Sequence, residues 1–252
     1  MTIKIFTTGS TGGVVAGGKS AIAGSAGPWT IAFWFRLHTT GNTNKNLSWS
    51  GVFSNPVSGA QTSVACGYNA TDRIDFYAAG GSGTNPFNGT SYYNITDTNW
   101  HHIAWRKNGS GASSFDKWLD GTMTQAIASL TLTLPVDEGL ALGCKGVISN
   151  TFSPNVEIHE WAQVPYAVPD SDLILMSKGV PFHRLNANYA LGNYFLMDGV
   201  DKFKDKMGKL EFNFQTNLEA SNPNIFESEE LIEVEQPRKV ANWYHGVYPS
   251  HV

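Results

Sequence analysis

The sequence has few charged residues and lacks long apolar runs. Only 15% of its 252 residues are charged, and 17 basic residues stand against 21 acidic ones, which gives a formal net charge of −4. That balance supplies no cationic surface for phosphate backbones, so we expect no nucleic-acid partner. No run approaches the roughly eighteen apolar residues of a membrane-spanning helix, and no export signal opens the chain. We therefore expect a protein without a membrane segment that is made and kept in a cytoplasm.

Cysteine is scarce. The two residues, Cys66 and Cys144, are too few for a disulfide framework. Neither lies in a Cys/His spacing that would hold zinc, so the sequence predicts buried free thiols and no metal site.

Turn formers and aromatic residues are plentiful. With 26 Gly, 11 Pro and 12% aromatic residues, the composition favours sheet over helix. In residues 30–37, Ile31, Phe33 and Phe35 alternate with Thr30 and Ala32, which predicts a strand with one buried face. Further strands are predicted at residues 64–66, 73–77, 101–107, 115–119, 123–127, 130–134 and 156–162. The sequence predicts an all-β protein, an antiparallel sandwich of two sheets.

Two local signals predict specific connections. Asp120 and Gly121 stand between two predicted strands and favour a tight hairpin, because Gly tolerates the positive φ of such a turn. One short helix is predicted near residue 173, with Asp170 or Ser171 as its N-cap and Gly179 closing it.

The composition shifts near residue 200. We predict a main domain over residues 1–215 and a C-terminal arm over residues 216–252, which begins acidic and ends rich in aromatic rings. The rings Trp243, Tyr244 and Tyr248 are the predicted partner contacts. Because termini fray unless they are docked, we expect the arm to lie on a neighbouring subunit, with a homotrimer as the hypothesis.

Residues 99–109 read Asn-Trp-His-His-Ile-Ala-Trp-Arg-Lys-Asn-Gly, and residues 117–121 read Lys-Trp-Leu-Asp-Gly. This pair resembles the paired-strand signature of the laminin-G-like and pentraxin-like jelly rolls in the concanavalin A-like superfamily. Other landmarks follow in the family's order, at residues 28–35, 140–143, 156–161 and 167–173. The resemblance covers about residues 10–180 and implies a jelly roll of two packed antiparallel sheets.

The resemblance also implies a function. Jelly rolls of this kind occur in tailed-phage virions, so the leading hypothesis is a non-enzymatic virion structural protein: a capsid decoration, head-fibre or tail component that contacts other virion proteins. The alternative is a carbohydrate-binding, lectin-like module that recognises a cell-surface glycan. The family's calcium-binding acids have no residue-by-residue match in this sequence, so no cofactor is predicted.

Residues 13–20, from Gly13 to Ser20, satisfy the P-loop pattern and include Lys19. A P-loop needs a helix that starts at its Lys-Ser pair. Gly24, Gly27 and Pro28 interrupt the chain too soon for one, so a Gly-rich strand and loop of the sandwich is the favoured interpretation.

Other arrangements with catalytic potential are weak. Glu157 and Glu160 do not complete a glycosidase motif, and a separation of three places them on opposite faces of a regular strand. His101 and His102 are adjacent, so they point to opposite sides and cannot chelate one ion together, and we expect one to pack in the core with its ring nitrogens satisfied. We predict no catalytic residues and no metal ligands.

Binding remains. Trp34, Trp105 and Trp118 are predicted to pack in the core or on a sheet face. Trp49, Tyr92 and Tyr93 lie in loop-like sequence and are the predicted ligand contacts, because exposed rings stack on sugars or fill interfaces.

Overall fold

A computed structural model describes part of the chain. It covers residues 3–5, 14–17, 21–22, 27–37, 40–41, 45–51, 63–70, 73–79, 93–109, 113–130, 139–142, 156–185, 187–195 and 211–213. The predicted arm, with Trp243, Tyr244 and Tyr248, lies outside the described residues, as do Tyr92 and most of the strand predicted at 130–134.

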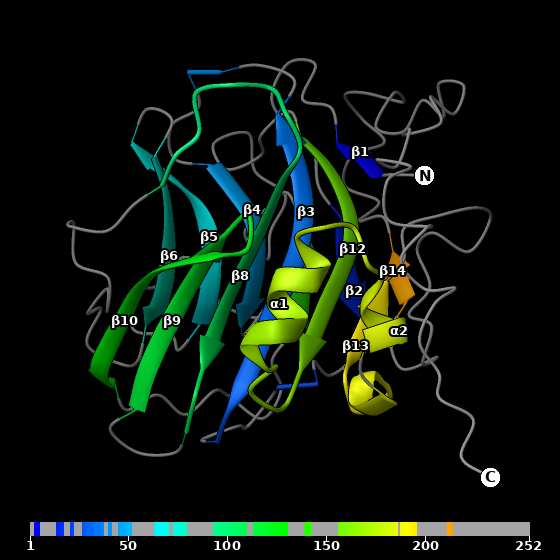
Figure 1. The fold of residues 1–252 in the computed structure, drawn as a ribbon. Helices are drawn as coiled ribbons and strands as arrows, with labels where there is room; N and C mark the ends of the chain where they lie inside the picture. Colours follow the sequence, from blue (N-terminus) through cyan, green and yellow to red (C-terminus); the bar gives the residue numbers. More distant parts are fainter. Residues whose placement is uncertain are drawn as a thin grey trace, which may run out of the picture.

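The described residues form two seven-stranded antiparallel sheets (Figure 1). Sheet A runs in the order β1 (Ile3–Ile5), β12 (Val156–Val164), β3 (Trp29–Leu37), β8 (His101–Lys107), β9 (Ser113–Leu119) and β10 (Thr122–Leu130), and β13 (Asn193–Phe195) also pairs with β12. Sheet B runs in the order β14 (Glu211–Asn213), β2 (Val14–Gly17), β11 (Gly139–Leu142), β4 (Lys45–Gly51), β5 (Ser63–Ala70), β6 (Arg73–Ala79) and β7 (Tyr93–Asn94). The predicted all-β sandwich is confirmed.

The helices are short and follow β12. They are α1 (Asp170–Met176), α2 (Phe182–Leu185) and the 3-10 helix η1 (Ala187–Leu191). Figure 1 shows α1 in front of sheet A, with β4, β5 and β6 behind that sheet. Sheet A therefore has an inner face toward sheet B and an outer face toward the helices.

The inner face of sheet A carries the predicted apolar stripe of β3. Ile31, Phe33 and Phe35 are each 0% exposed. The ring of Phe33 meets that of Trp105 on the neighbouring strand edge-to-face, with centroids 6.0 Å apart. The period-2 pattern thus identified the core face correctly, and Trp105 packs as predicted.

The opposite face of β3 is only partly exposed, which the sequence pattern did not predict. Thr30 and Ala32 are 1% and 2% exposed. Ala104, Ala32 and Ala162 lie side by side across β8, β3 and β12, in one apolar cluster with Leu173 and Met176 of α1. Because their side chains are small, the helices approach the sheet closely and cover this part of its outer face.

The prediction that Asp170 or Ser171 caps α1 is wrong. Pro169 occupies the N-cap position, and no side chain caps the helix there. The Asp170 carboxylate instead lies 2.7 Å from a guanidinium nitrogen of Arg106. The predicted end is correct: Gly179 has a φ of 85° and donates its N–H to the carbonyl oxygen of Met176 at 2.9 Å.

The predicted hairpin between β9 and β10 is confirmed. Asp120 and Gly121 have φ values of 50° and 78°, which suit a tight two-residue turn. Within the P-loop-like string, Val14–Gly17 form β2, which lies between β11 and β14 in sheet B. These residues are therefore part of an antiparallel sheet, as the sandwich interpretation expected.

Candidate functional site

The predicted ligand contacts Trp49, Tyr92 and Tyr93 are not brought together in the described part of the structure. Trp49 lies on β4, opposite Ala65 of β5 and Ala141 of β11, and its side chain is outside what the structure describes. Tyr93 lies on β7, is 6% exposed, and has the Lys117 Nζ 5.2 Å from its ring centroid. A ring so covered offers little surface to a ligand, and its role as a ligand contact stays a prediction.

A different set of rings lies on the outer face of sheet A, on the part of β3, β8 and β12 beyond the alanine row. His102, Trp34 and His159 are register partners across three neighbouring strands. Arg36 and Glu157 are partners in the next row, and Trp100 adjoins them just before β8. We call this set the aromatic face: Trp34, Arg36, Trp100, His102, Glu157 and His159.

Contacts within the aromatic face fix its polar groups around the rings. Arg36 donates a hydrogen bond to Glu157 at 2.8 Å, and its guanidinium carbon lies 5.1 Å from the Trp100 ring centroid. The Trp100 ring meets that of His159 edge-to-face, with centroids 6.5 Å apart. The face therefore combines a guanidinium and an imidazole with indole rings, held by strand register.

Exposure differs among these residues in a way that matters for binding. Glu157 is 2% exposed, whereas the Arg36 side chain is 30% exposed. Trp34, Trp100 and His159 are half-buried. Trp34 thus packs on a sheet face, as predicted, and is half-buried there. The alternation of residues 30–37 places Trp34 on the face of the strand opposite Phe33 and Phe35, and this signal could have marked it as a contact.

His102 is the fully buried member of the aromatic face, with 0% of its surface exposed. Its ring is 5.3 Å from that of Trp34. Burial lowers the pKa of His102 to about 4, so the ring is neutral at physiological pH. In the described part of the chain neither ring nitrogen has a hydrogen-bond partner, so the predicted satisfaction of these nitrogens is wrong, although the predicted burial is correct.

His101 points the other way, as the alternation of a strand requires. Its Nδ1 lies 2.8 Å from the Asp120 carboxylate and its Nε2 lies 3.1 Å from that of Asp97. The hydrogen bond to Asp120 is the main cause that raises the pKa of His101, and burial opposes it. Within the described residues, no group of His, Cys, Asp and Glu side chains is arranged to hold a metal ion.

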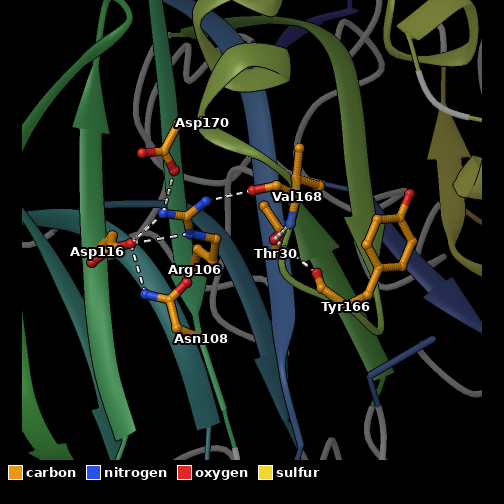
Figure 2. A network of polar contacts seen from close by, with 7 residues as sticks. All are labelled: Thr30, Arg106, Asn108, Asp116, Tyr166, Val168 and Asp170. Carbon is orange, nitrogen blue, oxygen red and sulfur yellow. Dashed lines mark hydrogen bonds and ion pairs between the residues drawn. The ribbon is translucent and has the colours of Figure 1, made fainter.

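A polar network on the other side of the alanine row from the aromatic face anchors the start of α1 (Figure 2). Arg106 of β8 donates to Asp116 of β9 and pairs with Asp170 at the first position of α1. It also donates to the Val168 carbonyl, and the Val168 N–H donates to the Thr30 hydroxyl oxygen at 2.9 Å. The covering helix is therefore held on the sheet by fixed side chains that the alanine row separates from the aromatic face.

The predicted placement of Glu157 and Glu160 on opposite faces is wrong. The register between β12 and β3 shifts between His159 and Ala162, so one extra residue bulges and the alternation is reset. Glu157 bonds to Arg36, and Glu160 bonds to Phe182 of α2, so both carboxylates lie on the outer side of sheet A. Each one is held by structural partners.

Comparison with solved structures places the fold in a known class. The chain is similar to a SAP-like pentraxin from Limulus polyphemus, with a TM-score of 0.50 and 10% identity over 70% of this chain and 80% of the other. It is therefore a jelly-roll β-sandwich with the fold of pentraxins. No protein-family model matches the sequence, and no curated protein matches it either.

Two further structures have lower scores. Domain 4 of AbnA, an extracellular arabinanase from Geobacillus stearothermophilus, solved with arabinotriose, has a TM-score of 0.45 and 9% identity over 70% of this chain and 81% of that one. The receptor-binding domain of botulinum neurotoxin C/D mosaic serotype has a TM-score of 0.45 and 10% identity over 64% of this chain and 37% of that one.

In the described ranges, no helix is long and apolar enough to cross a membrane.

Proposed function

We propose that this protein is a non-enzymatic, lectin-like binding module and that the aromatic face of sheet A binds a glycan. The observation that carries the proposal is the pair of half-buried indoles, Trp34 and Trp100, beside the partly exposed Arg36 on one sheet face. Elsewhere on this outer face the alanine row is covered by α1.

The chemistry of the face suits a sugar. An indole face packs against the C–H groups of a pyranose ring, and a guanidinium or imidazole nitrogen hydrogen-bonds its hydroxyl groups. Strand register and the bond between Arg36 and Glu157 fix these groups before a ligand arrives. Preorganisation of this kind lowers the entropy lost on binding.

The virion hypothesis is the more specific proposal. It derives from the resemblance noted in the sequence and concerns where the module is mounted, together with its trimeric state and its virion partners. A glycan-binding module on a virion would attach the particle to a host cell, so both proposals can hold together. Immunogold labelling of purified particles tests the virion location independently of glycan binding.

A glycan array followed by NMR titration of the indole N–H signals tests the binding proposal. We expect a saccharide to shift the Trp34 and Trp100 signals, and Trp34→Ala and Trp100→Ala each to weaken binding by about tenfold or more. Leu191→Ala is the matched control, because Leu191 is an apolar residue of η1 that is 57% exposed. Binding that both tryptophan variants leave unchanged would reject the aromatic face as the site.

A further inference from the structure

Glu160 occupies an unusual position in β12. Its φ is 49°, one of two positive φ values among the described non-glycine residues. It lies at the bulge where the register with β3 shifts. The residue is 2% exposed, so the bulge turns a carboxyl group into the interface between sheet A and the segment that follows α1.

That carboxyl group joins both ends of one segment to the sheet. Its Oε1 accepts the backbone N–H of Phe182, the first residue of α2, at 2.6 Å. The same oxygen accepts the hydroxyl of Tyr194 on β13 at 2.9 Å. The elements α2, η1 and β13 are together called the cover segment. Glu160 therefore contacts the first and the last helix or strand of the cover segment.

A ring cluster surrounds this contact. His183 Nδ1 lies 3.1 Å from the Tyr194 hydroxyl. Since that hydroxyl donates to Glu160, it accepts from His183. The ring centroids of His183 and Tyr194 are 5.6 Å apart, and those of Tyr189 and Tyr194 are 5.8 Å apart. A change at the carboxyl group thus reaches the helices through Tyr194.

Burial raises the pKa of Glu160 to about 7, and the hydrogen bonds from Phe182 and Tyr194 oppose the rise. The titratable and charged residues on the elements packed around Glu160 are His183 and Arg184 of α2, Tyr189 of η1, Tyr194 of β13, Glu157 and His159 of β12, Arg36 of β3, Lys4 of β1, and Asp170, Asp172 and Lys178 in and after α1. Among these, His183 lies nearest along the hydrogen-bond chain.

We propose that Glu160 is a proton-dependent latch: the cover segment stays packed on sheet A while the Glu160 carboxyl group carries its proton, and it opens more readily once that proton is lost. The reason is that an ionised carboxylate in this buried position lacks the hydration it would gain in water. Opening of the cover segment exposes Glu160 to solvent and relieves that penalty. This inference does not depend on glycan binding.

The sign of the effect follows from linkage. In the open segment Glu160 titrates near its ordinary pKa of 4.5, and in the closed segment near 7. The closed form therefore binds more protons between these values, so opening becomes easier as pH rises, by up to about tenfold per pH unit. Above about pH 7 both forms are ionised, and the effect levels off.

Hydrogen exchange measured by mass spectrometry from pH 5 to pH 8.5, corrected for the intrinsic pH dependence of exchange, tests the latch. We expect peptides from residues 182–195 to lose protection by at least tenfold between pH 5.5 and pH 7.5, while peptides from β8 and β9 do not follow. The variant Glu160→Gln keeps an acceptor oxygen but cannot ionise, so its cover segment should show no such pH dependence.

Two control variants test whether Glu160, and not a neighbouring residue, causes the pH dependence. His183→Asn removes the nearest histidine and should keep the pH dependence, which would be lost if His183 were the group that titrates. Glu157→Gln replaces the other buried carboxylate of β12, so it should reduce overall stability without moving the pH midpoint of the cover segment. Equal pH dependence in wild type and Glu160→Gln would overturn the proposal.

Carbon-13 NMR of the side-chain carboxyl groups in the wild-type protein serves if Glu160→Gln does not fold. We expect one glutamate carboxyl group to titrate near pH 7. Its midpoint should return to about 4.5 when the cover segment is unfolded. A folded protein in which every glutamate titrates near 4.5 would also overturn the latch. Neither outcome bears on whether the aromatic face binds a glycan.

Discussion

Arg106 and Asp170 form an ion pair of 2.7 Å that joins the middle of sheet A to the first residue of α1 (Figure 2). The two partners differ greatly in exposure, with 8% of the Arg106 side chain and 63% of the Asp170 side chain accessible. Arg106 also binds the buried Asp116 and the Val168 carbonyl oxygen. The guanidinium is thus the centre of the network, and Asp170 is its exposed member.

We predict that Arg106→Met destabilises the protein by about 3–5 kcal/mol, because it leaves the Asp116 carboxylate buried without its cationic partner. Methionine keeps an apolar chain beside Trp118, whose ring lies 5.6 Å from the guanidinium carbon. Asp170→Asn is the matched control and should cost less than about 1 kcal/mol, since that partner is exposed. Urea denaturation measures both, and equal losses would contradict the central role of Arg106.

A second prediction concerns Gly121 in the hairpin. A Cβ there would collide with the Oγ of Ser177 just after α1, and the φ of 78° already disfavours other residues. We expect Gly121→Ala to destabilise the protein by about 2–4 kcal/mol. Gly179→Ala is the control, because Gly179 has a φ of 85° but nothing within 4 Å of its Cβ position. It should cost only the backbone strain, about 1 kcal/mol.

The double variant Gly121→Ala, Ser177→Ala isolates the collision from the strain. Removing the Ser177 hydroxyl should recover part of the loss measured for Gly121→Ala in the same thermal melts. No recovery would mean that the hairpin does not rest on the end of α1.

Local patterns predicted much of the fold because they reflect local physics. The alternation from Ile31 to Phe35 identified the core face, and Asp120 with Gly121 identified the hairpin. Residues 101–107 were predicted as a strand with the bounds that β8 has. In each case neighbours in the chain determine the conformation, through side-chain alternation or through the φ that a turn requires.

What the sequence did not predict depends on contacts between distant segments. Asp170 resembles an N-cap, yet its carboxylate is drawn to Arg106, 64 positions earlier in the chain. The bulge at Glu160 leaves no mark in the residue pattern, since no glycine stands at its left-handed position to signal it. Alternation along one strand places Trp34 on the face opposite Phe33, but it could not predict that Trp100 and His159 would join it there, because they come from other segments.

The adjacent histidines lead to a third prediction: as pH falls, His102 lowers the stability of the folded protein and His101 raises it. The pKa of His102 is lowered to about 4 from 6.5, so the unfolded chain binds the proton first and stability falls as pH drops through this range. The loss amounts to about 3 kcal/mol at pH 4. The pKa of His101 is raised, so protonated His101 stabilises the folded protein at low pH. This stabilisation is lost as pH rises through the pKa that His101 has in the folded protein.

We therefore expect His102→Phe to become more stable than the wild type as pH falls from 7 to 4.5, since phenylalanine fills the buried site without a charge to suppress. His101→Gln should lose stability relative to the wild type most strongly near pH 5, where His101 is an imidazolium beside Asp97 and Asp120. Chemical denaturation across this range measures both variants. The same pH trend in the two variants would contradict the opposite placement of the rings.

The last prediction concerns the alanine row beneath α1. Ala104 is 0% exposed and belongs to the cluster that includes Leu173 and Met176. Ala104→Leu adds volume where the helix meets the sheet, so we expect a loss of about 1–3 kcal/mol and a selective loss of hydrogen-exchange protection in α1. Ile103→Val is the matched control on the opposite face of β8. It removes one methylene from the core between the sheets, should cost about 1 kcal/mol, and should leave the relative protection of α1 unchanged. If Ala104→Leu instead weakened all elements equally, α1 would not be packed on this row, and the boundary between the covered surface and the aromatic face would have to lie elsewhere.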